Sequence, residues 1–189
     1  MIRLAIFASG SGTNAEAIMK RFVGHKSIRV ELILTNKKDA GVIARAERLR
    51  VPCQVFNKTQ LEEGWLLEPL KNHSIDYIIL AGFLLKIPVS LIQVFPNRIC
   101  NIHPALLPKY GGKGMYGHHV HEAVIHAGEK ESGITIHLVN EEYDKGRILF
   151  QATCPVLPED SPDDLASRIH KLEHEHYPRV VEEFVLGKG

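Results

Sequence analysis

The sequence has no excess of charge of either sign. Its 189 residues include 23 Lys and Arg and 22 Asp and Glu, which gives a formal net charge of +1. A near-neutral chain lacks the strongly basic character that nucleic acid or an anionic membrane attracts. We therefore expect neither nucleic acid nor a membrane as a partner.

Long apolar runs are also missing. No run approaches the roughly 20 residues of a transmembrane helix, and residues 1–8 lack the basic start and long apolar core of a signal peptide. Cysteine is scarce, with only Cys53, Cys100 and Cys154 in the sequence. Their number is odd, and no two of them form a C-x-x-C motif. This usage argues against a disulfide framework and favours a reducing compartment, so we expect a cytoplasmic protein.

Patterns for a metal site or a serine nucleophile are absent despite eleven histidines. His170 and His174 are four residues apart and His119 and His121 are two apart. Neither pair extends to an H-E-x-x-H motif or to a His and Cys set with zinc spacing. No G-x-S-x-G elbow is present either. We expect no metal and no serine nucleophile.

What the chain does contain is an alternation of apolar strands with amphipathic helices. Its length and its 44% hydrophobic composition fit one domain over residues 1–189. The pattern predicts an α/β fold of three layers, α/β/α, with a mostly parallel sheet, a Rossmann-like N-terminal half and antiparallel strands at the C-terminal end. Strands are predicted over 2–8, 29–35, 52–56, 76–80, 98–102, 133–139 and 147–153, and helices over 15–22, 40–50, 59–72, 88–94, 118–127 and 161–184. In the 59–72 helix, Thr59 and Glu62 match a capping box, and Trp65, Leu66 and Leu70 are expected to face the core.

A glycine-rich loop, residues 9–14, separates the first strand from the first helix. Such a loop lets backbone N–H groups approach a phosphate, and the helix start adds unpaired donors. It is not a Walker A loop, but Gly10, Gly12 and Ala15 fit G-x-G-x-x-A. The second strand is followed by Asn36-Lys37-Lys38 instead of an acidic residue, which argues against NAD and leaves NADP open.

The most informative stretch is Cys100 to Pro108, where a buried strand runs into a loop between two prolines. Asn101 and His103 are two residues apart, so they share one side of the strand, while Cys100 faces the core. An amide and an imidazole thus stand at the carboxyl end of a strand, where open α/β sheets bind ligands. The alternative is a strand end with a hydrogen-bonded structural histidine.

A carboxylate joins this pair from the loop over residues 140–146. Asp144 lies in that loop, which follows the strand carrying His137 and also has turn chemistry, so a plain turn residue is the alternative. An amide donor, an imidazolium and a carboxylate suit acyl transfer to an amine. The first two stabilise an oxyanion, and the carboxylate keeps the histidine charged or relays protons.

Two further segments allow two interpretations each. Residues 83–87 are apolar and belong either to the core or to the wall of a pocket for a flat heterocycle. Residues 111–117 contain four glycines and form either a mobile lid or an incidental surface loop.

Taken together, the motifs resemble those of the phosphoribosylglycinamide formyltransferases, a folate-dependent formyltransferase family of purine biosynthesis. The resemblance covers residues 2–185. It is carried by the order and spacing of residues 9–14, 80–83, 101–108, His137 with Asp144, Glu173-His174 and Tyr177-Pro178. The sequence departs from many members in having Leu85 where they carry a folate-contacting arginine.

The resemblance implies two binding sites. Gly12, Thr13 and Asn14 would bind the phosphate of the substrate, and Glu173 would contact the same substrate, with His170 and Lys171 beside it. 10-Formyltetrahydrofolate would be the co-substrate, and its pterin would be framed by Leu84, Leu85, Lys86, Ile87, Asn101, Asn140, Glu141, Glu142, Tyr143 and Asp144.

The resemblance also implies roles in catalysis. Asn101 and His103 would stabilise the oxyanion, His103 would donate a proton, Asp144 would assist proton transfer and His137 would support the site. Residues 1–100 would form a phosphate-binding half and residues 101–189 a catalytic and folate-binding half. The partners would be small molecules, and the protein would be a monomer or a homodimer without a metal.

Other functions share part of this pattern. Formyltetrahydrofolate deformylase and methionyl-tRNA formyltransferase also have the Asn-x-His and Asp groups, but the first is expected to carry an additional N-terminal domain and the second a basic C-terminal extension. An NADP-binding reductase or a nucleotide-binding module needs only the glycine loop with Lys37 and Lys38. That alternative leaves Asn101, His103 and Asp144 unexplained.

Overall fold

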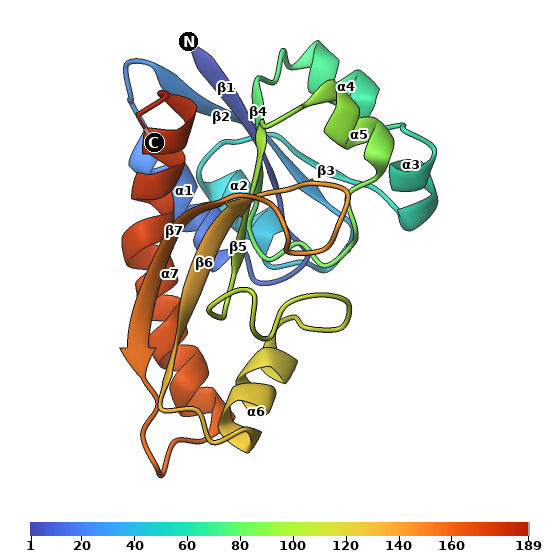
Figure 1. The fold of residues 1–189 in the computed structure, drawn as a ribbon. Coiled ribbons are helices and arrows are strands. Elements are labelled where there is room, and N and C mark those ends of the chain that lie inside the picture. The colour runs from blue at the N-terminus through green and yellow to red at the C-terminus, as the bar shows by residue number, and fades with distance from the viewer. Residues whose placement is uncertain (189) are drawn as a thin grey trace.

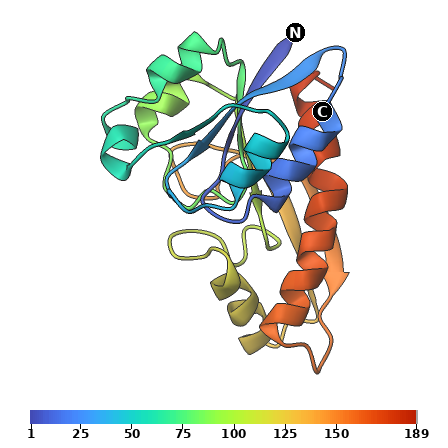
Figure 2. The same ribbon diagram turned by 180° about the vertical axis from the view of Figure 1, so that it is seen from behind.

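The computed structural model describes residues 1–188 as one sheet of seven strands in the order β3-β2-β1-β4-β5-β6-β7. Helices cover both faces of this sheet, as Figures 1 and 2 show from opposite sides. The strands are β1 (Ile2–Phe7), β2 (Ile28–Thr35), β3 (Cys53–Val55), β4 (Tyr77–Leu80), β5 (Ile99–His103), β6 (Glu131–Leu138) and β7 (Ile148–Pro155). The helices are α1 (Thr13–Phe22), α2 (Val42–Arg48), α3 (Lys58–Glu62), α4 (Leu67–Asn72), α5 (Val89–Val94), α6 (His118–His126) and α7 (Pro162–Val185).

Two hydrophobic cores lie on opposite faces of the sheet, because successive side chains of a strand alternate between the faces. In β1, Leu4 and Ile6 pack with side chains of α1, α2 and α7, whereas Ala5 and Phe7 pack with side chains of α3, α4 and α5. Both groups of β1 side chains are fully buried. This arrangement confirms the predicted three-layer α/β/α class.

Strands β1 to β5 run parallel to one another, and β6 and β7 are antiparallel additions. From β1 the chain runs through β2 and β3 to one edge of the sheet. It then returns to β4 beside β1 and continues through β5, β6 and β7 to the other edge, so the strand order reverses between β1 and β4. Ligands of open α/β sheets bind at such a switch point, beside the carboxyl ends of the strands. The glycine loop follows β1 and Asn101 and His103 end β5, so the fold brings both motifs to this edge.

Helix α7 packs against one face of the sheet near the carboxyl ends of β4 and β5. Its start matches the prediction, since Ser161 caps the helix through the N–H of Asp164 and Pro162 occupies the first turn. Tyr177 is fully buried, and its O–H donates to the carbonyl of Leu80 at 2.8 Å. This bond fixes α7 against the end of β4, so the α7 residues one turn earlier reach the switch point.

The segment 59–72 differs from the prediction of one helix. It forms the two short helices α3 and α4, because Asn57 and Gln60 make the capping box and Gly64, with φ of 78°, ends the first helix in a left-handed turn. The turn also reorients Trp65, which is 41% exposed instead of facing the core. Leu66 and Leu70 are buried as expected.

Candidate active site

A cavity of 420 Å³ opens at the switch point. It is bounded by the glycine loop, the segment after β4, the end of β5, the 112–117 loop, the 139–144 loop and α7. Most of the predicted site residues line it: Gly12, Thr13, Asn14, Leu84, Leu85, Lys86, Ile87, Asn101, His103, His137, Asn140, Glu142, Tyr143, Asp144, His170 and Glu173. Residues from both halves of the chain therefore share one cavity.

Two predicted residues lie outside the lining of this cavity. Lys171 is an exposed residue of α7, and Glu141 is exposed in the 140–146 loop. Neighbouring residues on a helix point about 100° apart, so Lys171 faces away although His170 and Glu173 face inward. Neither side chain lines the cavity, and ligand contacts from Lys171 and Glu141 stay predictions.

The glycine loop ends in a helix start suited to an anion. Gly12 has φ of 76°, and a Cβ on it would lie 2.5 Å from the Cβ of Val42, so only glycine fits. Helix α1 begins at Thr13, and among residues 1–188 no side chain caps it. Its first backbone N–H groups are therefore free to bind a negatively charged group, and the helix dipole favours that charge.

Glu173 connects α7 to this helix start. It is 5% exposed, and its Oε2 accepts hydrogen bonds from Asn14 Nδ2 and His170 Nδ1, both at 2.9 Å. The bond to Glu173 raises the pKa of His170. Asn14 Oδ1 is buried without a partner among the described residues. The glycine loop and α7 thus form one polar end of the cavity.

His103, the last residue of β5, is 4% exposed, and one hydrogen bond holds its ring. Its Nε2 lies 2.7 Å from the carbonyl oxygen of Tyr110, and since a carbonyl only accepts, Nε2 carries the hydrogen. Burial lowers the pKa of His103, and Asp144 and the Tyr110 carbonyl offset this only in part. At neutral pH the ring is therefore neutral, with the Nδ1 lone pair 3.8 Å from Asp144 Oδ2. A neutral ring suits the proton-relay role considered for the carboxylate.

Asp144 is both a turn residue and a site residue. Its φ is 53°, as in a left-handed turn, and its Oδ2 accepts the N–H of Gly112 at 2.8 Å. Its Oδ1 lies 3.6 Å from His137 Nε2. Burial raises the pKa of Asp144, but the N–H of Gly112 and the surrounding polar groups outweigh burial, so the pKa lies below its ordinary value. The carboxylate is therefore ionised at neutral pH.

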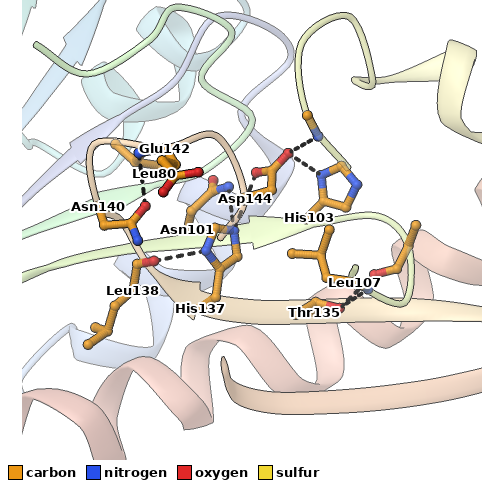
Figure 3. A network of polar contacts seen from close by, with 12 residues as sticks. Leu80, Asn101, His103, Leu107, Thr135, His137, Leu138, Asn140, Glu142 and Asp144 are labelled. Atoms are coloured by element: carbon orange, nitrogen blue, oxygen red, sulfur yellow. Dashed lines mark hydrogen bonds and ion pairs between the residues drawn. The ribbon is translucent and has the colours of Figure 1, made fainter. Parts of the chain in front are cut away.

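Asn101 is oriented by the strand next to it (Figure 3). Antiparallel register places it opposite His137, and its Nδ2 lies 3.1 Å from His137 Nε2. His137 Nδ1 lies 2.9 Å from the carbonyl of Leu138, so Nδ1 carries the hydrogen and Nε2 accepts from Asn101. One N–H of the amide is used in this way, and the second remains available in the cavity.

The segment after β4 is divided between the core and the apolar wall of the cavity. Phe83 packs edge-on against Phe7 at 5.3 Å and belongs to the core, while Leu84 is 41% exposed and lines the cavity. The N–H of Leu84 donates to Ser9 Oγ at 3.0 Å, which ties this wall to the glycine loop. A flat ring can pack against such a wall.

Several residues that line the cavity were not among the predicted site residues. His121 lines it at 3% exposure, its Nδ1 has no partner within residues 1–188, and burial lowers its pKa to about 4. Lys113, Met115 and Tyr116 of the glycine-rich 111–117 loop line it too. Helical periodicity from Val120 and Val124 could have shown that His121 borders the buried face.

Three other features can be compared with the structure: the basic pair considered for NADP, groups of metal ligands and membrane-spanning helices. Lys37 and Lys38 are exposed and lie outside the lining of the cavity, so the basic pair considered for NADP is not part of this site. Within residues 1–188, no group of three or more His, Cys, Asp or Glu side chains is placed to hold a metal ion. In the same range, none of the helices has the length and apolar character needed to cross a membrane.

The site therefore combines an anion-binding helix start with an amide, an imidazole and a carboxylate on an α/β sheet. Residues 2–181 match the family model described as formyl transferase. The chain belongs to the formyl transferase family.

Several similar proteins are phosphoribosylglycinamide formyltransferases. The protein of Haemophilus influenzae is 34% identical over 195 residues, covering 100% of this chain and 89% of its own length. The chloroplastic protein of Arabidopsis thaliana is 46% identical over 186 residues, covering 95% of this chain. The chain spans only 64% of that plant protein and 60% of the one from Vigna unguiculata.

Solved structures agree with this assignment of the family. The phosphoribosylglycinamide formyltransferase of Anaplasma phagocytophilum has a TM-score of 0.91 at 34% identity, with 99% of this chain and 88% of that one covered. The protein of the same description from Streptococcus pneumoniae has a TM-score of 0.87 at 35% identity, covering 98% and 99%.

Proposed function

We propose that the chain transfers the formyl group of 10-formyltetrahydrofolate to the amine of phosphoribosylglycinamide, a step of de novo purine biosynthesis. The products are formylglycinamide ribonucleotide and tetrahydrofolate. The observation that carries the proposal is the convergence of Asn101, His103 and Asp144 in one cavity with the free start of α1. The descriptions of the relatives support the same substrate.

The phosphorylated substrate fits the polar end of the cavity. The N–H groups of Gly12, Thr13 and Asn14 at the helix start bind its phosphate. Glu173, already fixed by Asn14 and His170, accepts hydrogen bonds from its ribose hydroxyls. This orientation points the amine toward His103.

The folate fits the apolar end. Leu84 to Ile87 form one side of this end, and Asn140, Glu142 and Tyr143 form the other, which suits a flat ring with polar edges. When bound, it supplies the formyl carbon that the amine attacks. Residues 1–100 thus bind the phosphate, and residues 101–189 provide the catalytic groups and part of the folate site.

The polar groups divide the chemistry among them. The free N–H of Asn101 stabilises the negative charge that develops on the formyl oxygen as the amine attacks. His103 accepts the proton released by the amine at Nδ1, and the ionised Asp144 stabilises the resulting imidazolium. His103 then donates that proton to the nitrogen that leaves the formyl carbon, which returns the ring to its neutral state. No covalent bond to the protein is needed.

We also place this reaction in the cytoplasm. Support for this compartment comes from the free cysteines Cys53, Cys100 and Cys154, since unpaired thiols suit a reducing environment. The chloroplastic plant relatives define the alternative compartment.

The test is a steady-state assay with phosphoribosylglycinamide and 10-formyltetrahydrofolate in which formylated product and formate are measured together. We expect one formylated product per folate consumed and formate at the level without enzyme. Formate release without the amine would instead show the deformylase alternative. A matched control is Glu62→Gln, since Glu62 is an exposed carboxylate of α3 that pairs with Lys58, and this change should leave both rates unchanged.

A further inference from the structure

The loop after β5 contacts both members of the histidine–carboxylate pair through its backbone. The carbonyl of Tyr110 accepts the Nε2 hydrogen of His103, with 2.7 Å between nitrogen and oxygen. The N–H of Gly112 donates to Asp144 Oδ2 at 2.8 Å. Two peptide groups only two residues apart therefore set the relative position of His103 and Asp144.

This short turn has an unfavourable backbone conformation. Tyr110 has φ of 55°, in the left-handed region that non-glycine residues avoid. Gly111 leaves no room for a side chain, because a Cβ there would lie 2.5 Å from Leu107 Cδ2 and 3.3 Å from Asp144 Cβ. A turn of this kind persists only when contacts elsewhere hold it.

Those contacts come from outside the cavity. The O–H of Tyr110 donates to Glu129 Oε1 at 2.9 Å, and Lys109 Nζ approaches the same oxygen at 2.9 Å. Glu129 lies just after α6 and is not part of the cavity lining. The Lys109 and Tyr110 hydrogen bonds lower its pKa, so Glu129 is an ionised and therefore strong acceptor.

We propose that Glu129 is a positioning residue for the transfer reaction, holding Tyr110 so that its carbonyl fixes the His103 ring and the next turn presents Gly112 N–H to Asp144. Glu129 touches neither substrate nor reacting atoms and acts through Tyr110. The inference rests on the proposed function for its kinetic consequence, but the geometry it describes is independent of the substrate.

The proposal predicts a change in the titration of His103. The charged and titratable groups around His103 are Asp144, His137 and Glu173, and none of them contacts Glu129. The Tyr110 carbonyl favours the protonated ring, so loosening it lowers the pKa of His103 further. Because the neutral ring is the base, the acid limb of kcat/KM then moves to lower pH.

The test uses Tyr110→Phe and Glu129→Ala, separately and together. Each single change should lower kcat about three- to tenfold, the effect of one hydrogen bond lost at a distance from the chemistry, with the acid limb shifted to lower pH. The double variant should be no slower than either single one, because both remove the same contact. Glu129→Gln keeps an oxygen that accepts from Tyr110 and should restore most of the rate, and Glu62→Ala is the control for loss of an exposed glutamate.

The His103 ring is followed in parallel by NMR, with the thermal midpoint of each variant as a check on folding. Wild-type kcat and an unchanged His103 titration in folded Tyr110→Phe and Glu129→Ala would overturn the inference. Full additivity of the two changes would also overturn it. If the wild type transfers no formyl group, the proposed function fails, yet the shift of the His103 titration still decides the positioning role.

Discussion

The side-chain amide of Asn101 and the imidazole of His137 face each other across β5 and β6, with 3.1 Å between Nδ2 and Nε2. Because Nε2 of His137 accepts, the amide is held with its nitrogen toward the histidine and its second N–H in the cavity. The amide that we propose to be catalytic is thus oriented in this structure, which is the condition for electrostatic stabilisation without reorganisation.

This relationship predicts a graded loss of activity. Asn101→Ala removes the donor and should lower kcat about 10²-fold. His137→Leu keeps the donor but removes the acceptor that orients it, so the loss should be about tenfold. His137→Gln offers a carbonyl oxygen as a substitute acceptor and is the matched control. Equal kcat in wild type and folded His137→Leu would show that the amide needs no orientation.

Replacement of Asp144 should change the pH dependence of the reaction. The carboxylate partly offsets the lowering of the His103 pKa by burial, so Asp144→Asn lowers that pKa further. The acid limb of kcat/KM therefore shifts to lower pH, and kcat falls because the imidazolium loses its partner. An unchanged pH–rate profile in the folded variant would reduce Asp144 to a turn residue.

A negative charge at the start of α1 should oppose binding of the phosphate. Thr13→Asp places a carboxylate beside the proposed anion site, while an acid in the first turn remains compatible with the helix. We expect KM for phosphoribosylglycinamide to rise at least about tenfold by like-charge repulsion. Thr13→Asn is the neutral control. An equal KM for both variants would move the phosphate elsewhere.

Stability should depend on an ionised carboxylate on α1. Glu16 is 8% exposed, and its contacts with Lys20, Arg48 and Arg45 lower its pKa to about 2. A lowered folded-state pKa contributes stability that is full above the unfolded value of about 4.5 and is lost as pH falls toward 2. Since Lys20 and Arg48 are more than half exposed, we expect Glu16→Gln to cost about 1–2 kcal/mol at pH 7.

Urea unfolding of wild type and Glu16→Gln at several pH values measures this effect. The difference in unfolding free energy should shrink between pH 4.5 and pH 2. A constant difference over that range would assign the effect to packing instead of charge.

The fold was predictable because its signals are local. The continuous apolar run of β1, the Ser161 cap and the succession of strands and helices need only neighbouring residues to be recognised. The prediction of one helix over 59–72 was wrong for a local reason too, because the Asn57 cap and the left-handed turn at Gly64 outweigh helical periodicity.

The site was predictable only in part. Motif spacing brought Asn101, His103 and Asp144 to attention, but their hydrogen bonds depend on backbone groups that no side-chain pattern reveals. The Tyr110 carbonyl on His103 and the Gly112 N–H on Asp144 are of this kind. The neutral state of His103 likewise follows from burial, which becomes known only when the loop is folded over the strand.

The most direct test of the account is a single turnover with a labelled formyl group on the folate, in the wild type and in His103→Ala. We predict that the label passes to the amine product without appearing on the protein or as formate, and that the variant, though folded, transfers it about 10²-fold more slowly or worse. Label bound to the protein, label released as formate, or an unchanged rate in His103→Ala would contradict it.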